Sequence, residues 1–174
     1  MSLEPEGKTE MLRHALATLA YRGKRAMEGA PAEFATFPGA VRTPGEILAH
    51  LGDLLDWALQ LANGTREWRP SGAVAWEQGT ARFFAALETL DLRLASGEPL
   101  GAPAERVFQG PIADALTHVG QIAMLRRLAG CPQHGENYYE AEIAVGRAGW
   151  EQAPAKVAFQ AIKKAHRGTG AFEF

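Results

Sequence analysis

The sequence predicts an all-α protein: a four-helix bundle in a single domain, followed by a C-terminal extension. Three observations favour this fold class: apolar residues recur at helical spacing in four stretches, glycine and proline separate these stretches, and 174 residues suffice for one hydrophobic core. We expect helices over about residues 8–28, 43–62, 74–96 and 111–130, and the extension over 131–174. The helices should be antiparallel, although the connections are long enough for a topology other than simple up-and-down.

An apolar stripe defines the first helix. Its members are Met11, Ala15, Leu16, Leu19 and Ala26. His14 lies beside this stripe, and we interpret it as a partly buried packing residue rather than a ligand. Glycine and proline then break the helical pattern, which predicts a loop over 30–42 with Phe34 and Phe37 packed against the bundle.

The second helix has a strong start signal in the sequence TPGE. Thr43 can cap the free backbone amides, Pro44 suits the first helical position, and Glu46 completes a capping box. The helix should end before the Asn-Gly pair that starts at Asn63. His50 lies on the flank of its apolar stripe, where a lone histidine is more often a hydrogen-bonded core residue than a metal ligand.

Aromatic and leucine side chains define the third helix, which we expect to start at about residue 74. Its buried side comprises Trp76, Phe83, Phe84, Leu87, Leu90 and Leu94, and we interpret these residues as core rather than as a ligand-binding set. The segment SGEPLGAPAER, residues 96–106, is predicted to be a loop because it is rich in glycine and proline. The fourth helix should start at Pro111 and end at Gly130, shortly before Pro132.

The fourth helix carries polar groups on the face that we expect to pack inward. Asp114, His118 and Gln121 lie on the same side as Ile122. Burying such a group without a partner costs about 1–3 kcal/mol. Because Asp114 and His118 are four residues apart, their side chains can converge on one point. The D-x-x-x-H pair therefore indicates a metal site, and it favours His50 of the second helix as a further ligand.

The extension has a weaker pattern. Residues 142–145 could form a short strand or a single turn, and residues 157–166 could form a last short helix or run extended along the bundle. The basic sequence KKAHR near the end is interpreted as a solvated surface.

Composition excludes several partner classes. The formal net charge is −2, from 18 Lys and Arg against 20 Asp and Glu, so neither nucleic acid nor an anionic membrane is an expected partner. No apolar run is long enough to span a bilayer, and the polar N-terminus does not resemble a signal peptide. A single cysteine fits a reducing compartment, so we expect a cytoplasmic protein.

The second-helix histidine in TPGEILAHLGDLLDWAL and the fourth-helix DALTHVGQ resemble the DinB-like (YfiT-like) superfamily of metalloenzymes. The resemblance covers about residues 8–130 and the GENYY segment, and it implies that residues 1–174 form a single DinB-like helical bundle domain. Members commonly bind a divalent metal ion through one histidine of the second helix and an H-x-x-x-H pair of the fourth. The matching ligands here are His50, Asp114 and His118. Asp114 departs from the commoner histidine, and Val119 departs from the arginine or polar residue of many relatives.

A carboxylate in place of the histidine is compatible with a metal site. Two imidazoles and one carboxylate form a recognised three-ligand set that leaves coordination positions open. Zinc and nickel are the leading candidate ions, with manganese or iron as further options. Gln121 would support the ligands from outside the first coordination sphere, or it would only bridge two helices. The alternative is a degenerate site in which Asp114 forms a salt bridge or hydrogen bond with His118 or His50.

The resemblance implies a thiol-dependent S-transferase or isomerase, in which a low-molecular-weight thiol cosubstrate binds the metal as a thiolate. A bound water with a lowered pKa would instead support a metal-dependent hydrolase. The competing hypothesis is a non-catalytic bundle that binds a small ligand or a protein and keeps a degenerate metal site. No residue of the sequence identifies the substrate.

We expect a homodimer, because relatives commonly pair through their helices and because Trp57 and Trp68 are candidate interface aromatics. Cys131 should be neither a nucleophile nor a ligand. It lies at the C-terminal end of the fourth helix, where the helix dipole disfavours a thiolate, and it is more than about three turns beyond His118.

Overall fold

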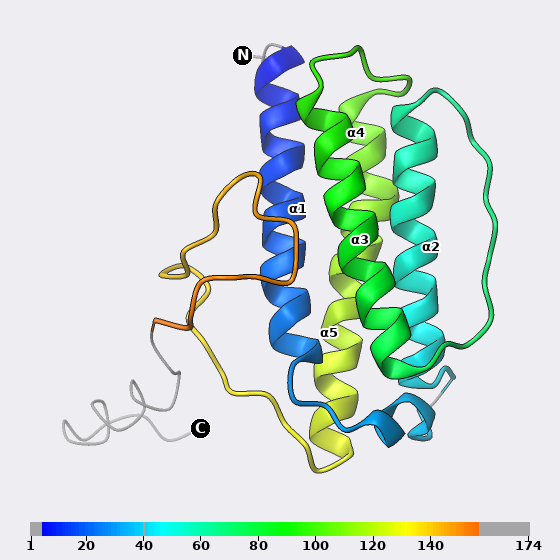
Figure 1. Cartoon of the computed structure of the whole chain (residues 1–174), viewed down its shortest axis with the longest axis vertical. Coiled ribbons are helices and arrows are strands. Elements are labelled where there is room, and N and C mark those ends of the chain that lie inside the picture. The colour runs from blue at the N-terminus through cyan, green and yellow to red at the C-terminus, as the bar shows by residue number, and fades with distance from the viewer. Residues whose placement is uncertain (1–4, 40, 157–174) are drawn as a thin grey trace, which may run out of the picture.

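The computed structural model describes residues 5–39 and 41–156, and within those ranges it confirms an all-helical protein. Four long helices pack side by side (Figure 1). They are α1 (Pro5–Met27), α2 (Pro44–Ala62), α3 (Trp76–Ala95) and α5 (Ala113–Leu128). The short elements are η1 (Ala32–Thr36), α4 (Ala104–Val107) and η2 (Phe108–Ile112). Within the same ranges, no helix combines the length and the apolar character that crossing a bilayer requires.

Two pairs of neighbouring helices are parallel, which corrects the antiparallel arrangement that we expected for all four. Arg82 of α3 donates to the carbonyl of Ala49 at 3.3 Å, and Arg93, three turns later, donates to that of Ala62 at 2.8 Å. The helices α2 and α3 therefore run in the same direction. The same holds for α1 and α5: Lys8 near the start of α1 pairs with Glu105 in α4, just before α5, and Arg126 near the end of α5 donates to the carbonyl of Ala26 near the end of α1. The connection over 63–75 runs along α2 (Figure 1). It can reach about 40 Å when extended, whereas the 19-residue α2 is only about 28 Å long.

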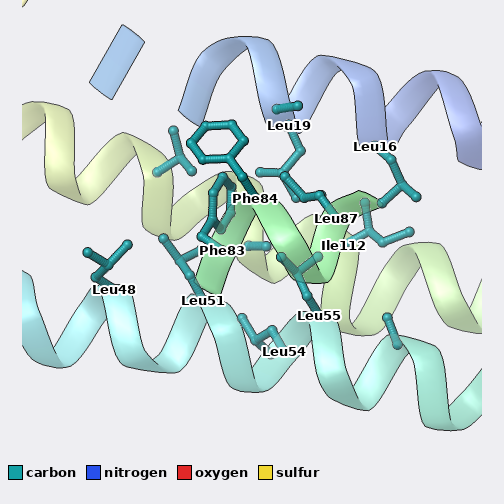
Figure 2. Close-up of a cluster of buried hydrophobic side chains, with 14 of the residues drawn as sticks. Leu16, Leu19, Leu48, Leu51, Leu54, Leu55, Phe83, Phe84, Leu87 and Ile112 are labelled. Carbon is teal, nitrogen blue, oxygen red and sulfur yellow. The ribbon is translucent and has the colours of Figure 1, made fainter. Parts of the chain in front are cut away.

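The core lies between the long helices, and Figure 2 shows part of it. Helices α1 and α2 contribute leucines, and α3 contributes two phenylalanines and a leucine. The labelled side chains, all buried, are Leu16, Leu19, Leu48, Leu51, Leu54, Leu55, Phe83, Phe84, Leu87 and Ile112. Two expectations for α1 are wrong: Met11 is 58% exposed, and His14 is also exposed rather than half-buried. This side of α1 lines a surface groove. The groove lies beside α4, and no residue of α3 contributes to its lining.

The predicted start of the second helix is confirmed. The Thr43 hydroxyl accepts a hydrogen bond from the backbone amide of Glu46, and the Glu46 side chain accepts one from the Thr43 amide at 2.7 Å. Before this capping box, Phe34 is buried and Phe37 is half-buried, as predicted. The helix α3 starts at Trp76, two residues later than expected.

Helical structure before α5 begins earlier than predicted. It starts at Ala104 rather than at Pro111, so the last residues of the predicted loop over 96–106 are helical. Pro111 lies inside η2, a single π-helical turn in which the amide of Ala113 donates to the carbonyl of Phe108. The wider turn accommodates a proline, which has no N–H to donate, and it alters the rotation of the helix that follows.

A buried polar cluster attaches the extension to α1. The carboxylate of Glu136 accepts a hydrogen bond from the Tyr21 hydroxyl, and it lies 3.2 Å from Nε of Arg25. Arg25 also donates to the carbonyl of Ala153 at 2.7 Å. These contacts hold residues 131–156 along one side of α1 (Figure 1).

Within the extension, residues 142–145 do not form a strand. A turn at Val145 and Gly146 is present instead, with the amide of Arg147 donating to the carbonyl of Ala144 at 3.1 Å. The alternatives for residues 157–166 and the KKAHR patch lie outside the described residues.

Candidate metal centre

The helices α2 and α5 bring the three predicted ligands together. His50 lies near the middle of α2 on its flank, with 20% of its side chain exposed. Asp114 and His118 lie one turn apart on the facing side of α5, and the His118 side chain is only 12% exposed. The imidazole rings of the two histidines meet edge to face, with centroids 4.7 Å apart.

The distances between the donor atoms fit a shared ion better than a direct hydrogen bond. Nε2 of His50 lies 3.6 Å from one Asp114 oxygen, and Nε2 of His118 lies 3.5 Å from the other. Both distances exceed the 2.7–3.2 Å of ordinary N–H···O bonds. They are close to the separation of about 3.4 Å between two ligands that bind one zinc ion tetrahedrally at about 2.0–2.1 Å. One donor atom from each of the three residues lies within 4.8 Å of the others.

Gln121 is positioned to control the tautomer of His118. Its Oε1 lies 2.9 Å from Nδ1 of His118, one turn away on α5. An amide oxygen can only accept, so this contact requires a proton on Nδ1, and Nε2 is the ring nitrogen on the Asp114 side. This is the arrangement of a residue that orients a metal ligand without binding the metal itself.

Two tryptophans that we considered only as interface candidates lie beside the site, although they do not line its cavity. Trp68, from the connection after α2, contacts the His50 ring edge to face, with centroids 5.7 Å apart. Trp57 contacts Trp68 edge to face, also with ring centroids 5.7 Å apart. Nothing in the local sequence pattern indicated this role, because it depends on the path of the connection across α2.

A buried carboxylate holds this connection in place. Asp53 is 3% exposed, and its carboxylate accepts hydrogen bonds from the amide and the hydroxyl of Ser71 and from Arg82. Arg82 also donates to Asp56 at 2.6 Å. Burial by itself raises the pKa of Asp53, but the hydrogen bonds from Ser71 and Arg82 outweigh it, and the pKa lies below its ordinary value. The network therefore attaches the segment that carries Trp68 to α2 and α3.

The centre opens into a cavity of about 570 Å³ between α2 and α5. Arg42, Ile47, Met124 and Leu125 contribute to its lining, together with the candidate ligands and Gln121. Burial, followed by the charges of His118 and Arg42, lowers the pKa of His50, while Asp114 and Asp53 oppose the shift. The shift favours the neutral form of the His50 ring, which is the form that binds metal ions.

The site lies at the edge of the bundle, which corrects our prediction that its polar groups face inward. Asp114 and Gln121 are exposed, and the core face of α5 carries Ala115, Val119 and Ile122 instead. Arg126 is also buried on this helix, where it donates to two carbonyls at the end of α1 and to that of Cys131. Cys131 does not line the cavity, and its inert role stays a prediction.

Comparison with known proteins identifies no relative of the chain. No protein-family model matches the chain, and no curated protein or solved structure matches it significantly. The resemblance to the DinB-like superfamily therefore stays a hypothesis, and the argument for a metal rests on the arrangement of the side chains.

Proposed function

We propose that the chain is a metal-dependent enzyme of the DinB-like superfamily in which His50, Asp114 and His118 bind a divalent ion. The observation that carries this proposal is the spacing of three donor atoms, within 4.8 Å of one another, from two different helices beside an open cavity. A ligand set of two imidazoles and one carboxylate favours zinc, with nickel as the next candidate.

A bound divalent ion would supply a Lewis acid that favours the deprotonated form of a thiol or a water molecule beside it. The other tasks belong to the chain. Gln121 holds His118 with Nε2 free, and Trp68 restricts the rotation of the His50 ring. Ile47 and Leu125 contribute apolar side chains to one wall of the cavity.

We favour a thiol-dependent transferase or isomerase over a hydrolase. Hydrolysis commonly uses a further carboxylate or histidine as a general base. Among the described residues that line the cavity, only the three candidate ligands carry a carboxylate, an imidazole or a thiol. Attack by a thiolate needs no such base once the thiol proton has passed to solvent. The sulfur forms the new S–C bond, and the leaving group departs with the electron pair of the broken bond.

The test starts with protein purified without an affinity tag or chelator. We expect about one zinc or nickel ion per chain. The loaded protein should accelerate the reaction of mercaptoethanol with chlorodinitrobenzene, and Asp114→Ala should remove both the ion and the acceleration. Absence of metal after growth with several divalent ions would favour the alternative, a non-catalytic bundle. A metal-loaded protein that hydrolyses esters but ignores thiols would favour the hydrolase.

The homodimer stays a prediction, with a changed candidate surface. Trp68 is 39% exposed, as the prediction assumed, but it contacts both His50 and Trp57, so we no longer favour this pair as the interface. An apolar groove of about 700 Å³ between α1 and the α4–α5 region, lined by Met11, Phe108 and Leu116, is the better candidate. Sedimentation should show a dimer that Met11→Glu dissociates, whereas a wild-type protein that is monomeric at micromolar concentration would contradict the prediction.

A further inference from the structure

A single cation lines the cavity beside the candidate metal centre. Arg42 is exposed in the turn before α2, and it is the only lysine or arginine among the described residues that line this cavity. Glu46, four residues further on, is already engaged, because its Oε2 accepts hydrogen bonds from the amide and the hydroxyl of Thr43 at 2.7 and 3.0 Å. Arg42 thus lines the cavity, and within the described residues its side chain forms no hydrogen bond with Glu46.

The charge balance of the cavity favours an anion. Asp114 is the only carboxylate in its lining, and a divalent ion bound there would more than neutralise it. Arg42 adds a further positive charge to the lining of the same cavity. With a divalent ion bound at the centre, a molecule that enters this cavity would therefore meet an excess of positive charge.

The remaining walls suit a carbon skeleton. Ile47, Leu125 and Met124 present apolar side chains to the same cavity, and Met124 is 52% exposed. A volume of about 570 Å³ is within the range of small-molecule sites. The lining thus combines an apolar wall, a candidate metal centre and a guanidinium, which matches a ligand with a reacting group at one end and an anionic group at the other.

We infer that the substrate or the thiol cosubstrate carries a carboxylate, and that Arg42 is the residue that selects for it. This inference rests on the proposed function, because the reacting end of the ligand is taken to lie at the metal centre. Arginine suits the task, since its planar fork of N–H donors matches the two oxygens of a carboxylate.

The test compares two thiols of similar size on the cobalt-loaded protein: mercaptopropionate, which carries a carboxylate, and mercaptopropanol, which is neutral. Cobalt absorption reports metal binding, and the thiolate-to-cobalt absorption band reports thiol binding. We expect Arg42→Gln to weaken mercaptopropionate about 10-fold and to leave mercaptopropanol within about twofold. Arg42→Lys should recover part of the preference. Arg106→Gln is the matched control, because it removes the same charge from an exposed position outside the cavity.

Each of the other possible outcomes would overturn the inference, and the measurements distinguish these outcomes from one another. Unchanged mercaptopropionate affinity in Arg42→Gln would mean that the carboxylate chelates the metal or stays in solvent. Equal losses in Arg42→Gln and Arg106→Gln would mean that only the overall charge matters. A wild-type protein that binds no cobalt would overturn the proposed function and this inference with it, whereas cobalt binding without thiol selectivity would overturn the inference alone.

Discussion

His118→Ala should weaken zinc or nickel binding by more than about 100-fold. Its Nε2 is one of three donor atoms that lie within 4.8 Å of one another, so its removal leaves two ligands, one from each helix. Partners outside the coordination sphere typically contribute about 10–100-fold to metal affinity, and loss of a ligand should exceed that. His50→Ala and Asp114→Ala should have the same effect. The measurement is competition against a chromophoric chelator, with circular dichroism to confirm that the helices are retained.

Two further variants distinguish the metal ligands from the residue that orients one of them. Gln121→Ala should weaken binding by only about 10–100-fold, because it frees the His118 ring without removing a donor atom. Asp114→His should keep or strengthen zinc and nickel binding, since it restores the three-histidine pattern that the resemblance implies. Wild-type affinity in both His50→Ala and Asp114→Ala would refute the site.

Asp53→Ala should lower the free energy of unfolding by about 3 kcal/mol, the low end of the cost of breaking a buried ion pair. Asp53 is 3% exposed and accepts hydrogen bonds from both Ser71 and Arg82, so its loss removes the acceptor of the Ser71 amide and one of the acceptors of Arg82. The connection that carries Trp68 should then loosen from α2. We expect a red-shifted tryptophan emission together with the lower stability in urea titrations.

The matched control is Asp56→Ala. Asp56 binds the same arginine at 2.6 Å, but its side chain is 55% exposed, so its removal should cost less than about 1 kcal/mol. The sign of the pH dependence also follows from the low pKa of Asp53. Its stabilising effect should be complete above the unfolded pKa of about 3.9 and should be lost as the pH falls through the lower folded value. Equal destabilisation by the two variants would contradict this account.

The sequence by itself determined features that depend on residues close together in the chain. The capping box of Thr43 and Glu46 predicted the start of α2, because both of its hydrogen bonds form within one turn. Helical spacing predicted most of the core, since one stripe of each helix must be buried. The pair Asp114 and His118 was found in the same way, because residues four apart on a helix are neighbours wherever the helix packs.

Only the tertiary structure decided how these local features meet. The sequence allowed either direction for α3. In the structure, the connection over 63–75 runs back along the length of α2, so α2 and α3 are parallel. The π-helical turn at Pro111 precedes α5 and affects the rotation of α5 about its own axis. In the packed structure, Asp114 and Gln121 lie at the edge of the bundle rather than in its core. Trp68 and Arg42 join the site from segments without helical periodicity. Such contacts depend on the path of connections between helices, and the spacing of apolar residues does not encode that path.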